Sequence, residues 1–549
     1  MDIGSKIKEF FKGEVTTTKS DLEKYSRDAS LFKIEPSVVV FPKDTEDLKN
    51  LIKFISESKK ENSSLSLTMR SGGTDMTGAA ISESIVADVS KHINKLKDVG
   101  SNYAVTEPGV FYRDFEKETL KKGLLLPSYP ASREICTVGG MVSNNAGGEK
   151  TLAYGKTIDY VKELKIILRD GNEYTFGPVS EEELESKKKL ENLEGEVYRK
   201  VSDLVMNNYE ALQKAKPKVS KNSSGYYLWD VYNPNTKVFD MTKILVGSQG
   251  TLGVITEIKF NLVKPKNHRR LLIVFLKDTK YLAEITHKLL EFKPESLESY
   301  DDHTFKIAIK FLPDLAKKLK GNVFRLAFNF LHEFWLIFTK GMPKLIMLAE
   351  FSSDTADMAF KKTKSAEKAL VDFKLDTKIT LPGYDTEKYW VIRRESFNFL
   401  RQKIRNLKTA PFIDDIIVNP DYLPEFLPQL YKILDEYPII YTVAGHVGDG
   451  NFHIIPLMDL DDPKTKSSIL SISRRVYDLV LKFNGSITAE HNDGLIRGPY
   501  LKQFFGSEVY KIFEDLKNIF DPENIFNSGK KIGSSLEYAL KHFDSNQKS

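Results

Sequence analysis

A short stretch with two histidines, residues 445–453 (GHVGDGNFH), constrains the fold more than any other part of the chain. Asp449-Gly450 favours a type I′ turn, because both residue types tolerate the positive φ that this turn requires. A turn centred there places His446 directly opposite His453 on an antiparallel hairpin, with Cβ atoms roughly 5 Å apart. Two imidazoles at that distance can chelate a divalent metal; the alternative is an ordinary polar pair within a sheet.

The composition is that of a large globular protein. A chain of 549 residues with 41% hydrophobic content is long enough for three or four units of about 150 residues. Its 81 basic and 76 acidic residues leave a net charge of only +5. That balance does not favour a nucleic-acid binder.

The chain has one cysteine, Cys136. One thiol can form neither an intrachain disulfide nor an iron–sulfur cluster, which needs about four thiolates. Cys136 is therefore interpreted as a small packed residue. The N-terminal residues lack the apolar core of a signal peptide, and no stretch reaches the ~20 apolar residues of a membrane span. We expect a cytoplasmic, reducing location.

The most apolar stretch is residues 323–338, VFRLAFNFLHEFWLIF, and a basic segment, KKLK at 317–320, precedes it. Its polar residues recur at helical spacing as a narrow stripe. Such a helix can lie in a membrane interface and make the protein peripheral on the membrane. The alternative, which we favour, is a buried helix or a lid.

The order of predicted strands and helices indicates an α+β fold. Short β-rich runs alternate with helical segments in the first half, and the last part is mostly helical. The predicted regions are a helical lead-in at 1–35, a β-rich region at 36–266, a second mixed region at 267–456 with an apolar insertion near 306–345, and a helical region at 457–549.

Three loops rich in small residues lie in the β-rich region, at 70–79, 137–148 and 246–256. Small residues let the backbone approach a ligand closely, and successive N–H groups can form an anion-binding nest. The first loop, RSGGTDMTGA, has neither the Rossmann nor the Walker spacing. One such loop is weak evidence, since a plain tight turn explains it equally well. Three together suggest an extended nucleotide between two sheets.

These loops, the histidine stretch, Glu490-His491 and the segment 520–530 (FDPENIFNSGK) resemble the FAD-linked oxidases of the vanillyl-alcohol-oxidase/PCMH type. Within them the chain resembles the D-2-hydroxyacid dehydrogenases over about 36–533. The resemblance implies a two-part FAD-binding domain, a substrate or cap domain with an antiparallel sheet, and a helical C-terminal segment that completes the active site. The residues it assigns to FAD are Arg70, Ser71, Gly72, Gly73, Thr74, Asp75, Thr77, Gly78, Pro130, Thr137, Gly139, Gly140, Asn144, Asn145, Gly147, Gly253, Ile255 and Asn527.

The resemblance also implies a mechanism. Some relatives bind flavin covalently through a histidine in the first loop, where this chain has Thr74, so non-covalent FAD is expected. A divalent metal, Zn²⁺ or Mn²⁺, at His446, His453 and Glu490 would lower the pKa of the substrate hydroxyl. His491 would then take the hydroxyl proton as the base.

Two basic residues are candidates for holding the substrate carboxylate, Arg393 and Lys408, because guanidinium bonds carboxylates bidentately and a family lysine has the same role. Three positions depart from the mitochondrial relatives: Phe397, Ile455 and Asn492. They suggest a more apolar pocket.

The predicted function is oxidation of a D-2-hydroxy acid, resembling D-lactate, to the 2-oxo acid. Electrons would pass to an external quinone, cytochrome or electron-transfer protein. Two alternatives stay open: oxidation of another alcohol on the same fold, and a non-catalytic flavin-binding subunit of a larger complex.

Overall fold

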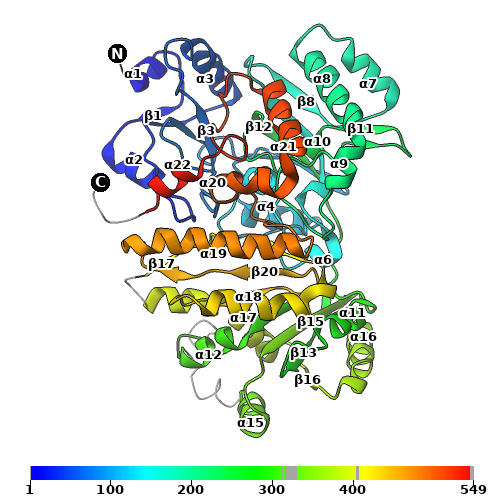
Figure 1. The fold of residues 1–549 in the computed structure, drawn as a ribbon. Helices are drawn as coiled ribbons and strands as arrows, with labels where there is room; N and C mark the ends of the chain where they lie inside the picture. The colour runs from blue at the N-terminus through cyan, green and yellow to red at the C-terminus, as the bar shows by residue number, and fades with distance from the viewer. Residues whose placement is uncertain (1, 312, 316–318, 320–329, 404–406, 545–549) are drawn as a thin grey trace.

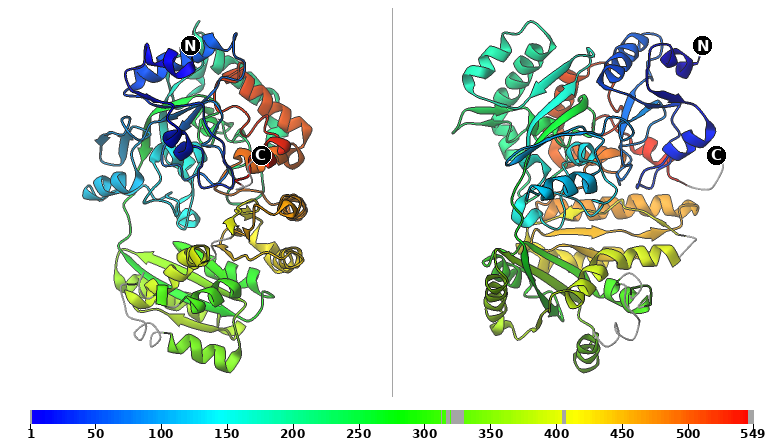
Figure 2. Two further views of the ribbon diagram at one scale, coloured as in Figure 1. Left: turned by 90° about the vertical axis from the view of Figure 1, so that its left-hand side faces the viewer. Right: turned by 180° about the vertical axis from the view of Figure 1, so that it is seen from behind.

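The computed structural model describes residues 2–311, 313–315, 319, 330–403 and 407–544. Figure 1 shows two lobes, and both ends of the described chain lie in the upper one. The upper lobe contains the first and second sheets. The lower lobe contains the third sheet, and α19 (Pro463–Lys482) runs between the lobes, as the two further views in Figure 2 also show.

The first sheet has the order β1-β2-β4-β3, formed by Glu14–Thr16, Val38–Phe41, Ile85–Asp88 and Leu67–Arg70. β2, β4 and β3 are parallel, and α3 (Thr45–Ser58) buries Leu48, Leu51 and Ile52 against them. The predicted helical lead-in is wrong in one respect. β1 lies between α1 (Ile3–Lys8) and α2 (Lys19–Tyr25) and pairs antiparallel with β2.

The second sheet is antiparallel, with the order β5-β6-β12-β7-β8. Its strands are Leu96–Val99, Tyr103–Thr106, Val254–Asn261, Val161–Ile167 and Glu173–Phe176. α21 (Leu501–Phe520) returns from the C-terminal region and packs on α8 (Leu193–Asn207), where Phe513 and Leu516 join the core of this sheet. This part of the C-terminal region thus belongs to the upper lobe, whereas α19 packs on the third sheet.

The third sheet has seven antiparallel strands in the order β16-β13-β15-β14-β19-β20-β18. The strands are Asp376–Ile379, His268–Leu276, Leu345–Ser353, Ser296–Asp301, Val443–His446, Asn451–Ile454 and Ile416–Ile417. Alternate residues of β13 face opposite sides. Leu272 and Val274 pack towards α11 (Leu282–Leu290) and α18 (Leu423–Asp435), whereas Leu271 and Ile273 pack towards α12 (Asp302–Lys310) and α17 (Tyr384–Lys403). An antiparallel sheet in the second region confirms the predicted fold class.

The other described helices are α4 (Tyr112–Lys121), α5 (Val138–Asn144), α6 (Thr151–Tyr154), α7 (Glu181–Lys188), α9 (Tyr209–Ala215), α10 (Thr242–Leu245), α15 (Leu331–Lys340), α16 (Ala356–Lys368), α20 (Gly494–Arg497) and α22 (Leu536–Lys541). The short strands are β9 (Pro178–Val179), β10 (Tyr232–Asn233), β11 (Val238–Asp240), β17 (Lys408–Thr409) and β21 (Leu457–Met458).

The histidine hairpin exists, but its predicted register is wrong. β19 and β20 pair His446 with Asn451 and Ala444 with His453, so the connection is the four-residue loop 447–450. Gly450 has φ +74, and a Cβ there would lie 1.9 Å from the Val418 carbonyl oxygen. The loop therefore packs closely against the segment that contains Val418. A prediction made from the two turn residues alone does not take this long-range packing into account. The two histidines remain on one face, as diagonal neighbours.

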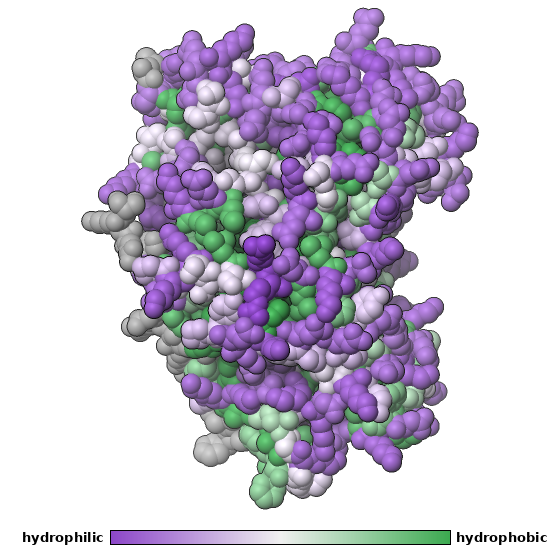
Figure 3. All heavy atoms as spheres, viewed as in Figure 1, coloured by the Kyte–Doolittle hydropathy of each residue, from purple (hydrophilic) through white to green (hydrophobic). Residues whose placement is uncertain are grey.

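The apolar stretch is only partly within the described chain, since residues 323–329 lie outside it. α15 buries Glu333 and Leu336, whereas Trp335 is 59% and Phe338 is 90% exposed. Figure 3 shows apolar side chains at the lower tip, where α15 lies in Figure 1. None of the helices in the described part of the chain is long and apolar enough to cross a membrane.

Candidate active site

Three cavities follow one another from the small-residue loops to the histidine hairpin. We call them the loop cavity (about 110 Å³), the central cavity (about 160 Å³) and the histidine cavity (about 480 Å³). Thr74, Gly140 and Asn144 line both the loop and central cavities. The walls shared by the central and histidine cavities include Met76, Pro130, Ala131, Gly147, Glu490 and His491. The three cavities are therefore adjacent, in a row that leads from the loops to the histidines.

The loop cavity is built mainly from backbone and small side chains. The predicted FAD residues that line it are Arg70, Ser71, Gly73, Thr74, Asp75, Thr137, Gly139, Gly140, Asn144, Gly253 and Ile255. The backbone N–H groups of residues 71–74 make no hydrogen bond within the described part of the chain. Four successive unpaired donors suit a pyrophosphate, because polar backbone groups need a partner when a ligand covers them.

Two glycines support the same fit. Gly140 and Gly250 line the loop cavity. A Cβ at Gly140 would approach only the Thr137 and Ser71 hydroxyls, at 3.4 and 3.5 Å, and a Cβ at Gly250 would meet nothing within 4 Å. Side chains at these positions would extend into the cavity, so glycine keeps the space open for a ligand.

Several predicted cofactor residues shape the loops and do not line the loop cavity. Asn527 is buried and ties three segments together: its Oδ1 accepts from Thr68 Oγ1, and its Nδ2 donates to the carbonyls of Ala79 and Gln249 at 2.9 and 2.7 Å. Even the guanidinium of Arg70, which lines the cavity, donates to the Arg27 carbonyl at 2.7 Å. The other residues of this structural group are Gly72, Thr77, Gly78 and Asn145.

The histidine cavity brings together the two hairpin imidazoles and Glu490. His446 Nε2 lies 3.3 Å from His453 Nε2 and 3.5 Å from Glu490 Oε2, and His453 Nε2 lies 3.9 Å from the same oxygen. Ligand atoms around a tetrahedral ion with bonds of ~2.1 Å lie roughly 3.4 Å apart. The three donors therefore fit such an ion and would leave a coordination position open towards the cavity.

Buried carboxylates hold the far nitrogens of both imidazoles. Glu298 Oε1 lies 2.6 Å from His446 Nδ1, and Asp414 Oδ1 lies 3.1 Å from His453 Nδ1. A carboxylate at Nδ1 stabilises the tautomer that presents Nε2 to a metal. Burial lowers the pKa of His446, but the Glu298 and Glu490 carboxylates together outweigh burial and raise that pKa to about 9.

Glu490 is held by a cation on its other oxygen. Lys221 Nζ lies 2.6 Å from Glu490 Oε1, and both side chains are buried. Burial raises the pKa of Glu490, but Lys221 and His446 oppose it and hold the pKa well below its usual value. Only Oε2 faces the two imidazoles, so Glu490 is oriented as a single-oxygen ligand.

His491 lines the same cavity and lies beside His453, with ring centroids 5.2 Å apart. Its Nδ1 lies 2.8 Å from Asp414 Oδ2. Burial lowers the pKa of His491, but the carboxylates of Asp415 and Asp414 raise it to about 9. A strongly shifted imidazole in a cleft is typical of a group that transfers protons.

The two candidates for binding the substrate carboxylate lie in different places. Arg393 lines the histidine cavity, with Nη2 3.1 Å from Glu298 Oε2, and its buried Nε has no hydrogen-bond partner among the described residues. Lys408 is absent from the described walls of this cavity. Its Nζ lies 2.5 Å from the Asp544 carbonyl oxygen and 3.2 Å from the Asp544 carboxylate. Ile455 lines the cavity, and the Phe397 side chain lies outside the described part.

Two family models match most of the chain. Residues 36–177 match the FAD binding domain, and residues 265–531 match the C-terminal domain of FAD linked oxidases. The chain belongs to the FAD-linked oxidases. The loop cavity is thus suited to the cofactor that this family of FAD-linked oxidases binds.

Curated relatives are similar at low identity. D-2-hydroxyglutarate dehydrogenase of Escherichia coli is 26% identical over 533 residues, 95% of this chain and 50% of that protein, so the oxidase spans about half that relative's length. D-lactate dehydrogenase of Archaeoglobus fulgidus is 26% identical, covering 91% of this chain and 92% of that protein. Glycolate oxidase subunit GlcD of Bacillus subtilis is 24% identical, covering 92% and 91%.

Solved structures share the fold of this FAD-linked oxidase. The isoeugenol complex of 4-ethylphenol oxidase from Gulosibacter chungangensis superposes with a TM-score of 0.67 at 14% identity over 96% of each chain. p-Cresol methylhydroxylase with substrate bound gives 0.63 at 14% identity over 93% of this chain and 92% of that one. The two-lobed architecture is therefore that of the PCMH type.

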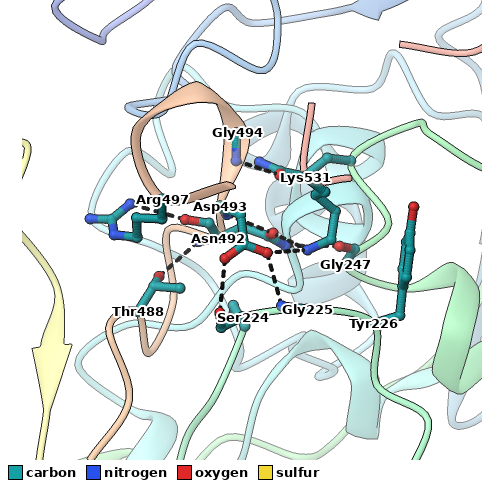
Figure 4. A network of polar contacts seen from close by, with 12 residues as sticks. Ser224, Gly225, Tyr226, Gly247, Thr488, Asn492, Asp493, Gly494, Arg497 and Lys531 are labelled. Carbon is teal, nitrogen blue, oxygen red and sulfur yellow. Dashed lines mark hydrogen bonds and ion pairs between the residues drawn. The ribbon is translucent and has the colours of Figure 1, made fainter. Parts of the chain in front are cut away.

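The segment after His491 is anchored by a buried network that sequence reasoning did not find (Figure 4). Lys531 Nζ lies 2.7 Å from Asp493 Oδ2 and 2.6 Å from Asn492 Oδ1, and Asn492 Nδ2 donates to the Gly247 carbonyl at 2.9 Å. Asn492 has φ +71, a conformation that asparagine tolerates better than most residues. The Asn492 side chain joins the third loop of the oxidase to the Glu490-His491 segment.

Proposed function

We propose that this FAD-linked oxidase oxidises a D-2-hydroxy acid, similar to D-lactate, to the corresponding 2-oxo acid. The observation that carries the proposal is that His446, His453, Glu490, His491 and Arg393 line one cavity that continues into the loop cavity. Such a cavity offers a metal site, a base and a carboxylate anchor next to a flavin. The names of the curated relatives, which include D-lactate and D-2-hydroxyglutarate dehydrogenases, support the same substrate class.

Bound FAD supplies a two-electron acceptor for the α-hydrogen, and a bound divalent metal, Zn²⁺ or Mn²⁺, supplies Lewis-acid polarisation of the substrate hydroxyl. His446, His453 and Glu490 would hold the metal. His491 takes the hydroxyl proton at Nε2, because its Nδ1 already faces Asp414. Arg393 holds the substrate carboxylate through its unpaired Nε. Lys408 is not proposed for this role, since its contacts lie with Asp544.

Reduced FAD would need an external electron acceptor, such as a quinone, a cytochrome or an electron-transfer protein. The single cysteine of this sequence cannot hold an iron–sulfur cluster. Peripheral membrane contact through 323–338 is part of this proposal. Its support is the exposed Trp335 and Phe338 of α15.

Anaerobic reduction of the bound flavin by a panel of D- and L-2-hydroxy acids tests the substrate class. We expect D-2-hydroxy acids to bleach the flavin spectrum at least 100-fold faster than their L-enantiomers, because one orientation presents the α-hydrogen to the flavin. Bleaching by simple alcohols and by neither enantiomer would assign the enzyme to another alcohol.

A further inference from the structure

Two adjacent aspartates, Asp414 and Asp415, precede β18 and have fully buried side chains. We propose that this pair positions the whole histidine cavity: Asp414 orients the rings of His453 and His491, and Asp415 holds the backbone that carries Glu490 and His491. The inference rests on the proposed function and adds two positioning residues to it. Neither aspartate is assigned a contact with substrate or metal.

Asp414 divides its two oxygens between two imidazoles. Oδ1 lies 3.1 Å from His453 Nδ1, and Oδ2 lies 2.8 Å from His491 Nδ1. The two rings stack at an interplanar angle of 28°. One carboxylate therefore hydrogen-bonds Nδ1 of a metal ligand and lies at ion-pair distance from Nδ1 of the base, which leaves both Nε2 atoms for chemistry. It also fixes the separation of the two rings.

Asp415 acts through backbone. Its Oδ2 accepts hydrogen bonds from the N–H groups of Glu490 and His491, both at 2.7 Å, and from Thr488 Oγ1 at 2.6 Å. Its Oδ1 accepts from Asn451 Nδ2, at the start of β20 in the hairpin, at 3.0 Å. One side chain thus joins the hairpin to the Glu490-His491 segment.

The conformation of the pair indicates a constraint beyond packing. Asp415 has φ +69, which is uncommon for a residue with a side chain. Arg497 donates from Nη2 to the Asp414 carbonyl oxygen and so fixes the peptide between the two aspartates. Two buried carboxylates and a left-handed residue are costly to fold, and apolar residues would fill the same space at lower cost. Every carboxylate oxygen of the pair instead lies within 3.1 Å of a group of the site.

Asp414→Asn is the decisive variant. An amide can accept from only one Nδ1–H, because its other end carries N–H donors that face the second imidazole. We expect the FAD-loaded variant to bind Zn²⁺ about 10- to 100-fold more weakly than the wild type, as loss of such a partner does elsewhere. Bound FAD should be unchanged, because Asp414 does not line the loop cavity. Competition with a chelator measures the Zn²⁺ affinity, and the flavin spectrum measures FAD.

Asp47→Asn is the matched control. Asp47 is also fully buried, and its carboxylate accepts backbone N–H groups from Lys12, Gly13 and Lys43, but it lies at α3 beside the first sheet. Its Zn²⁺ affinity should equal that of the wild type. Equal affinities for Asp414→Asn and Asp47→Asn would overturn the role of Asp414. If Asp414→Asn does not fold, Asp414→Glu replaces it, with an expected loss of at least threefold; wild-type affinity there would overturn the role equally.

The tautomer provides a readout that is independent of activity. In protein labelled with ¹⁵N-histidine, the Nδ1–H signals of His453 and His491 should both be present in the wild type, and at least one should be lost in Asp414→Asn. Asp415→Asn should retain both signals but weaken Zn²⁺ binding through Glu490. Failure of the proposed function is distinguishable, because then the wild type itself would bind no Zn²⁺ or would show no reduction by any hydroxy acid.

Discussion

The loop cavity and the histidine cavity are adjacent but are built in opposite ways. The loop cavity presents backbone N–H groups and glycines, and the guanidinium of Arg70 in its wall bonds to another part of the protein, the Arg27 carbonyl. The histidine cavity presents charged side chains, and each of its three candidate metal ligands has a buried partner: Glu298 for His446, Asp414 for His453, and Lys221 for Glu490. A large ligand is held by shape and many weak donors, whereas a metal and a proton need a few groups at fixed positions.

Removing one imidazole is the strongest test of this difference. We expect His446→Ala to lose Zn²⁺ and to slow flavin reduction by a D-2-hydroxy acid roughly 1000-fold, since a Lewis acid contributes several kcal/mol. FAD should remain bound, because His446 does not line the loop cavity. Metal analysis and stopped-flow absorbance measure the two effects. Retained turnover without metal would sink the metal hypothesis.

The converse change fills the loop cavity. Gly140→Leu would place a side chain between the loops, where Gly140 now meets only two hydroxyls. We expect about 10- to 100-fold weaker FAD binding, as overpacking by 1–3 kcal/mol implies, with Zn²⁺ binding unchanged. Gly177→Leu, between β8 and β9, is the control and should keep FAD. Simultaneous loss of both ligands would show that the two cavities are not independent.

A smaller effect is expected from the cation behind Glu490. Lys221→Met removes the partner of Oε1 and frees the carboxylate to turn, so Zn²⁺ affinity should fall about 10-fold or somewhat more while FAD stays bound. Lys216→Met is the control, since Lys216 pairs with Asp230 at the surface, at 2.8 Å. Titration calorimetry measures both. Equal affinities in the two variants would show that Glu490 does not need a cation.

His491 adds a dependence on pH. Its pKa is raised to about 9 by Asp415 and Asp414 against the effect of burial, and only the neutral imidazole can accept a proton. Anaerobic flavin reduction should therefore become faster as the pH rises towards 9, by up to about tenfold per unit on the steep part, and level off above it. A rate that is independent of pH across that range would remove His491 from the role of base.

The mildest test concerns the loop cavity alone. The predicted flavin is non-covalent, because Thr74 stands where some relatives have a linking histidine. Acid precipitation should release the yellow colour into the supernatant, whereas a covalent flavin would stay with the pellet. Absorbance of the two fractions decides the matter without any substrate.

The parts of the molecule that could be predicted from sequence depend on local patterns. The three small-residue loops and the hairpin with two histidines were located, and the loops do converge on one cavity. The register of the hairpin was wrong, because the contact of Gly450 with Val418 comes from a neighbouring segment. The strand β1 was not predicted, because the sequence of the first 35 residues has a helical pattern. β1 is a strand because it pairs with β2.

The groups that orient the site had no local signal. Glu298 is 148 positions from His446, Asp414 is 39 from His453, and Lys221 is 269 from Glu490. An isolated carboxylate or lysine in a sequence is most often a solvated surface group, and only burial beside an imidazole distinguishes these residues. Lys408 is the opposite case. A lysine can bind a substrate carboxylate, but the fold places this lysine beside Asp544.

The amino-acid sequence by itself determined which chemical groups are available: glycine-rich loops that can bind a nucleotide, two imidazoles on one hairpin, and a Glu-His pair. These follow from residue type and from contacts between near neighbours in the chain. The tertiary structure decided which carboxylates face those imidazoles, the orientation of Glu490 and the adjacency of the three cavities. Those properties depend on buried pairs between distant segments, whose electrostatic effect is strong only where the fold excludes water.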